Sequence, residues 1–126
     1  MGVYQKLAQD PTIDTHQVFL FATSAETPYL NGFVKKHPDL WVGLMQFNGA
    51  SPDLSVFPTG KPAPRILLTV GTFEERESAL KQYQEYANQQ GVAVDTIIHP
   101  DSAHVLMGKE PLTQKTRAIT RFVFDE

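Results

Sequence analysis

Apolar and polar positions follow two different periods along this chain. Short, almost continuous apolar runs predict buried strands at residues 18–22, 41–47, 65–70 and 92–98. Apolar residues spaced three or four apart predict helices at residues 3–8, 27–36, 74–90 and 110–124. Residues 48–64 are rich in Gly, Pro, Ser and Asp and predict a long loop. Alternation of strands with helices implies an α/β fold: a mostly parallel sheet of about four strands with helices on its faces.

The junction between the first strand and the next helix carries the first candidate for chemistry. Residues 18–26 read Val-Phe-Leu-Phe-Ala-Thr-Ser-Ala-Glu, so an apolar run stops at Ser24 among small residues. A strand-to-helix turn of this kind lifts a hydroxyl clear of the sheet, where a base can reach it. A second interpretation is a capping box, with Thr23 as the N-cap and Glu26 at the third helical position. Both interpretations stay open at this point.

Two other candidate groups follow later strands. Glu74 comes after the third strand, with Glu75 as the alternative acid, and His104 comes after the fourth strand. Because the carboxyl ends of parallel strands meet at one edge of a sheet, Ser24, Glu74 and His104 can lie at a common rim. The two glutamates also suit the first turn of a helix without any catalytic role.

Four further segments follow the serine in a fixed order. They are His-Pro-Asp-Leu at 37–40, a small-residue loop at 43–51, Gly-Thr-Phe-Glu at 71–74 and Pro-Asp-Ser-Ala-His at 100–104. This series resembles the C-terminal half of an α/β-hydrolase. The resemblance is closest to enterochelin-esterase-like or esterase D serine hydrolases, with prolyl-oligopeptidase-like hydrolases next, and it covers nearly the whole chain.

The resemblance implies one partial α/β-hydrolase domain over residues 1–126 and a serine hydrolase that cleaves a small carboxylic ester or other acyl substrate. In that family Ser24 would be the nucleophile, His104 the base and Glu74 the acid that orients the imidazole. The backbone amide of Ala25 would be an oxyanion donor. The resemblance implies no cofactor. A metal site at His99, Asp101 and His104 is not expected, because the spacing matches no strong ligand pattern.

The chain also departs from the family pattern. Ala22 and Glu26 stand where the family has glycines, and the strands that precede the nucleophile, with a loop that gives half of the oxyanion hole, are missing. These departures favour an alternative: a catalytically inactive remnant of the fold that serves as a binding or oligomerisation module. A third interpretation is a small anion-binding domain at the helix that opens near Thr23, where Glu26 would repel the anion.

The composition of the chain limits the classes of partner that it can bind. A net charge of −3, from 11 basic and 14 acidic residues, gives no basic footprint for nucleic acid or a membrane surface. The absence of cysteine excludes disulfides, and the first residues lack an apolar signal core, so a cytoplasmic location is expected. The apolar strand at 18–22 would lie at the edge of the sheet, where it invites pairing with another chain. We therefore expect a homodimer or a missing N-terminal half.

Overall fold

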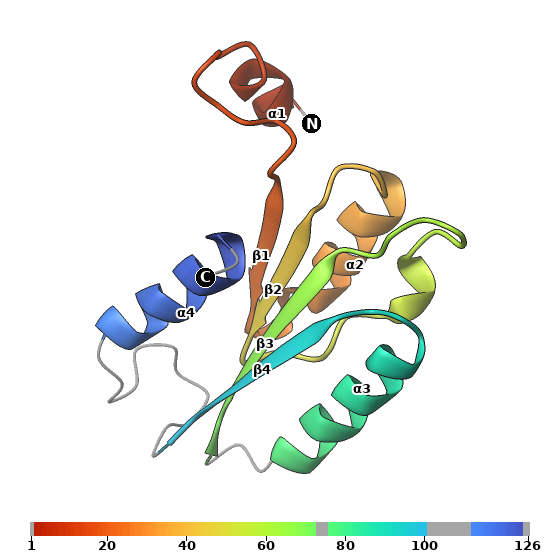
Figure 1. Ribbon diagram of the computed structural model, residues 1–126, viewed down its shortest axis with the longest axis vertical. Helices are drawn as coiled ribbons and strands as arrows, with labels where there is room; N and C mark the ends of the chain where they lie inside the picture. Colours follow the sequence, from red (N-terminus) through yellow and green to blue (C-terminus); the bar gives the residue numbers. More distant parts are fainter. Residues whose placement is uncertain (1, 73–75, 101–111, 125–126) are drawn as a thin grey trace.

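The computed structural model describes residues 2–72, 76–100 and 112–124, and within them four strands form one parallel sheet in the order β1-β2-β3-β4 (Figure 1). The strands are β1 (Phe19–Thr23), β2 (Gly43–Phe47), β3 (Arg65–Gly71) and β4 (Val94–His99). The helices are α1 (Gly2–Leu7), α2 (Thr27–Lys36), α3 (Glu77–Gln89) and α4 (Leu112–Phe124), with single 3-10 turns η1 (Ser24–Glu26) and η2 (Leu54–Val56). The predicted parallel α/β fold is confirmed.

The register of the sheet places the ends of all four strands at one edge. Thr23 lies beside Phe47, Phe47 beside Thr69, and Thr69 beside Ile97. All three strand pairs are parallel, so the segments that leave β1, β2, β3 and β4 start from the same rim. This is the rim on which the sequence placed the candidate groups.

Helices cover both faces of the sheet and make a three-layer molecule. In Figure 1, α2 and α3 lie on one side of the sheet and α4 on the other. Leu30 and Val34 of α2 and Leu80 and Ala87 of α3 belong to the larger apolar cluster. The smaller cluster gathers around Phe122 of α4. Four residues of the long loop also pack on the larger cluster, namely Leu54, Val56, Phe57 and Ala63.

Gly43 allows α4 to approach the sheet closely. A Cβ at this position would lie 2.7 Å from the ring of Phe19 and 2.9 Å from the ring of Phe122. These two rings meet edge to face with their centres 6.1 Å apart. A second glycine, Gly91, has a φ of 77° and follows the end of α3, where a left-handed residue commonly ends a helix.

The first strand is the least covered element of the sheet. Within the described residues β1 pairs with β2 alone, and Phe21 at its centre is 47% exposed. The predicted edge position of this strand is therefore confirmed. The preceding helix α1 stands away from the sheet and has no buried residue (Figure 1).

None of the helices in the described part of the chain combines the length and the apolar character that a membrane span requires.

Candidate active site

Ser24 lies in a sharp turn directly after β1. Its φ is 48°, a left-handed conformation that a residue with a Cβ rarely adopts. The chain then passes through η1 into α2, and the Ser24 residue is partly exposed at the carboxyl rim. Residues held in this conformation store strain, and such strain gathers at functional sites. A strained strand-to-helix turn is also the geometry of a nucleophile elbow.

The predicted capping box at this turn is present as well. The Thr23 amide donates to the Glu26 carboxylate at 2.9 Å, and the Thr23 hydroxyl donates to the same oxygen at 3.1 Å. The carboxylate of Glu26 is thus bound to the backbone that enters the turn. The capping and the elbow interpretations of residues 23–26 therefore describe the same piece of backbone and do not exclude each other.

Residues of β2 and of the loop that follows it contact the turn at Ser24. Gln46 is 1% exposed, and its Nε2 donates to the carbonyl of Ser24 at 3.4 Å. Its Oε1 is buried and has no hydrogen-bond partner among the described residues. A Cβ on Gly49 would collide with the Gln46 amide and the Ser24 carbonyl, so the loop after β2 passes very close to the elbow. Gln46 and Gly49 together confine the backbone at Ser24.

Side chains of both flanking helices fix the loop that follows β2. The Thr27 hydroxyl donates to the Ala50 carbonyl at 2.9 Å. The side-chain oxygen Oδ1 of Asn31 accepts from the backbone amide of Asp53 at 3.0 Å. The Tyr83 hydroxyl donates to the Pro52 carbonyl at 2.7 Å. The loop beside the elbow is thus held at three points.

Two titratable groups in this loop region have shifted acidities. A hydrogen bond from the Ser55 amide lowers the pKa of Asp53. Burial, together with the nearby Asp53 charge, raises the pKa of Tyr83. Neither shift has Ser24 or a neighbour of Ser24 among its causes, so these shifts concern the loop and not the candidate chemistry.

The structure describes only some of the other predicted site residues. Glu74, Glu75 and His104 lie outside the described residues, as does Asp101 of the alternative metal set. Ala25 is exposed and directly follows Ser24. His99 is 4% exposed at the end of β4, opposite Gly71 of β3. Among the described residues no group of three His, Asp or Glu side chains is placed to hold a metal ion.

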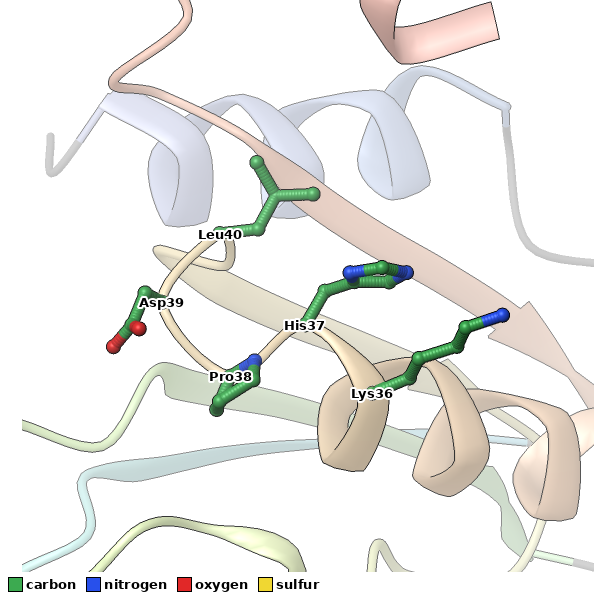
Figure 2. Close-up of a pocket in the computed structure, with 5 residues that line it drawn as sticks. All are labelled: Lys36, His37, Pro38, Asp39 and Leu40. Atoms are coloured by element: carbon green, nitrogen blue, oxygen red, sulfur yellow. The ribbon is translucent and has the colours of Figure 1, made fainter. Parts of the chain in front are cut away.

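A hollow at the opposite end of the sheet is not part of this site. It is lined by residues 36–40, which connect the end of α2 to β2 (Figure 2). Lys36 and His37 extend to one side of this turn and Asp39 to the other, where it forms an ion pair with Lys61. Both partners of the ion pair are more than half exposed, so the pair contributes little to the free energy of unfolding.

Solved structures with the same arrangement of elements identify the fold. A dienelactone hydrolase from Anabaena variabilis superposes with a TM-score of 0.69 at 19% identity, and the Francisella virulence factor BioJ with 0.67 at 12%. SOBER1 from Arabidopsis thaliana gives 0.64 at 20% identity. The chain has an α/β-hydrolase fold. All these identities are below 25%, so the likeness concerns the fold.

The comparison also shows how much of the α/β-hydrolase fold is present. The matches cover 98% of this chain but only 56–58% of the three structures, so the chain spans a little more than half of their length. No protein-family model and no curated protein matches the chain.

The sequence did not single out the residues that confine the elbow. Gln46 carried a signal, since it is a polar residue in the middle of the buried strand Gly-Leu-Met-Gln-Phe. Asn48, which is 3% exposed and has a φ of 54°, directly follows β2, whose last residue Phe47 lies beside Thr23. It had a weaker signal in its dipeptide Asn-Gly.

Proposed function

We propose that this chain carries the nucleophile of a serine hydrolase that acts on a small carboxylic ester. The observation that carries the proposal is the φ of 48° at Ser24, in the turn between a parallel strand and the helix that follows it. A capping box alone would not need this conformation, because an N-cap residue and the first helical residues have negative φ values. The strain supports a role for the hydroxyl.

The remaining groups of the site are assigned from the sequence. His104 removes the proton from the Ser24 hydroxyl while Oγ attacks the ester carbonyl, and it returns that proton to the leaving alcohol. Water then attacks the acyl-enzyme and releases the acid. Glu74, with Glu75 as the alternative, orients the imidazole. The Ala25 amide stabilises the developing oxyanion.

The spacing of the strands is compatible with these roles. β1 and β4 are three strand intervals apart, which is about 14 Å at the usual spacing. His104 follows His99 by five residues, and five extended residues span up to about 17 Å. The segment after β4 is therefore long enough to bring an imidazole back to the Ser24 turn.

The ordered segments at 37–40 and 71–74 support an enterochelin-esterase-like or esterase D type of hydrolase within this proposal. The substrate is a small molecule, and no cofactor takes part in the proposed steps. Loss of one oxyanion donor lowers the rate of such enzymes by about 10²–10³. Since the described residues offer only the Ala25 amide, we expect slow turnover from this chain alone.

Labelling with a fluorophosphonate tests the proposal directly. The reagent should add one phosphonyl group to the intact chain, and Ser24→Ala should abolish the adduct. Thr23→Ser is a matched control that keeps a hydroxyl next to the site and should still label at Ser24. No adduct on the folded wild-type chain, or an adduct that survives in Ser24→Ala, would contradict the assignment.

The Glu26 contacts favour a second candidate, an inactive remnant that works as a binding or oligomerisation module. The Glu26 carboxylate is held by Thr23 where the family has a glycine. This candidate predicts that Ser24→Ala leaves assembly unchanged and that neither form hydrolyses p-nitrophenyl acetate. Turnover that depends on Ser24 would exclude it.

A further inference from the structure

The open edge of β1 continues into an apolar groove along α2. The groove is lined by Leu20, Phe21 and Ala22 of β1 and by Glu26, Tyr29, Leu30 and Phe33 along the start and body of α2. Tyr29 is 72% and Phe33 46% exposed, and Phe21 is 47% exposed. Tyr29 and Phe33 therefore line one side of the molecule beside β1, which pairs with β2 alone in the described part of the chain. The ring of Phe21 packs against Phe47 on the other face of the sheet.

One side of α2, together with Glu26 of η1 before it, carries a stripe of side chains that runs from acidic to basic. Glu26, Tyr29, Phe33 and Lys36 recur at intervals of three or four residues, which places them on one side of the helix. The stripe begins with an acid, continues with two aromatic residues and ends with a base. The four positions are symmetric about residue 31. In a second stripe that runs in the opposite direction, the acid therefore lies opposite the base, and each aromatic residue lies opposite an aromatic residue.

We propose that the β1 edge and this α2 stripe bind a second copy of the chain around a two-fold axis. Two identical edge strands related by an axis perpendicular to the sheet pair antiparallel and give one closed, isologous interface. Pairing around Phe21 leaves no like charges opposed, because Phe-Leu-Phe-Ala-Thr contains no charged residue. The two sheets then form one continuous sheet of eight strands.

The same axis brings the two α2 helices together in opposite directions. Glu26 of one copy faces Lys36 of the other, and Tyr29 faces Phe33. Leu20 and Ala22, the neighbours of Phe21 in β1, line the same groove as the two aromatic residues of α2, so an axis through Phe21 passes close to the middle of the stripe. Charge complementarity and the apolar contacts thus select a second copy as the occupant, in one orientation.

The two lysines at the end of α2 provide a matched pair of variants. Lys36 belongs to the stripe, whereas Lys35 is one residue round the helix and close enough to Asp53 to lower the pKa of that carboxylate slightly. Lys36→Glu places a carboxylate opposite Glu26 twice per dimer and should weaken association about tenfold or more, as measured by sedimentation equilibrium. Lys35→Glu changes the net charge equally and should leave association unchanged.

A single cysteine tests the register. The chain contains no cysteine, so Phe21→Cys introduces one thiol, which lies opposite itself on the proposed axis. Mild oxidation should produce a covalent dimer of Phe21→Cys, while Tyr86→Cys on the exposed side of α3 should stay monomeric on a denaturing gel. Circular dichroism checks that each variant is folded, and Lys36→Glu remains informative where Phe21→Cys is unstable.

Two results would overturn the proposal. One is a wild-type chain that sediments as a monomer at all accessible concentrations, which would leave the edge to a different polypeptide. The other is a wild-type dimer that neither weakens with Lys36→Glu nor crosslinks through Phe21→Cys, which would place the dimer contact elsewhere. Neither result bears on labelling of Ser24, so this proposal and the proposed function fail independently.

Discussion

The backbone at Ser24 is held in its unusual conformation by its immediate neighbours. Thr23 is bound to Glu26 through two hydrogen bonds, and the Ser24 carbonyl accepts a hydrogen bond from buried Gln46. The backbone of Gly49 lies so close to the Ser24 carbonyl that a Cβ on Gly49 would collide with it, so this carbonyl has no space to turn toward Gly49. The surroundings therefore oppose relaxation, which is the condition under which a strained residue persists in a folded protein.

Glycine at position 24 should reveal this strain. Ser24→Gly and Ser24→Ala both remove the hydroxyl, but only glycine adopts a positive φ without steric cost. We expect Ser24→Gly to be more stable than Ser24→Ala by about 1 kcal/mol in urea denaturation, even though glycine has the more flexible unfolded chain. Equal stability of the two variants, or a more stable Ala variant, would show that φ at this position is not strained.

Only part of this local arrangement was visible in the sequence. Ser24, Thr23 and Glu26 were predicted because an apolar run that ends in Thr-Ser-Ala-Glu is a local pattern. The support from Gln46 and Gly49 depends on β2 lying beside β1, which is a tertiary contact. The positions of Glu74, Glu75 and His104 relative to Ser24 remain predictions.

Most helices and strands were predicted from the periodicity of apolar residues, and some of their observed bounds differ from the predicted ones. The helix at 27–36 and the strands at β1 and β3 lie within one residue of the predicted bounds. Trp41 and Val42 precede β2 instead of belonging to it, and β4 begins at Val94, although the backbone of Val42 still bonds to Val18 and Arg65. Not every apolar residue of α3 faces the core, since Ala79 and Tyr86 are exposed.

Tyr83 of α3 links a helix to the loop beside the elbow. Tyr83→Phe removes the hydrogen bond to the Pro52 carbonyl and keeps the ring, so it should lower the free energy of unfolding by about 1 kcal/mol. Tyr86→Phe is the matched control, because Tyr86 is 55% exposed on the same helix and should have no measurable effect. A similar loss in both variants would argue against a role for the Pro52 contact.

The pH dependence of the same pair gives a second measurement. Burial raises the pKa of Tyr83 above the value of about 10 for an unfolded tyrosine. The stabilisation by Tyr83 is therefore complete below about pH 10 and is lost as the pH rises further, since the unfolded state then releases a proton that the folded state keeps. The difference in stability between wild type and Tyr83→Phe should shrink above pH 10.

At the scale of the whole molecule, coverage of the sheet is uneven. Two helices and a well-anchored loop bury one face, and α4 covers the other through Phe122. By contrast, β1 pairs on one side alone among the residues that the structure describes. The chain spans 56% of the length of the dienelactone hydrolase that it matches. The apolar strand that enters the candidate site is thus also the strand with the least tertiary support.

Association through β1 should therefore appear in the thermal stability of the chain. If folded dimer is in equilibrium with unfolded monomer, mass action stabilises the dimer by about 1.4 kcal/mol for each tenfold increase in concentration. For a dimer of this size the melting temperature should rise by about 2–3 °C per tenfold increase. Scanning calorimetry of wild type, Lys36→Glu and Lys35→Glu over a wide concentration range measures this rise. We expect the same slope for wild type and Lys35→Glu and a lower melting temperature for Lys36→Glu at each concentration. A melting temperature independent of wild-type concentration would mean that β1 is stable without a second copy.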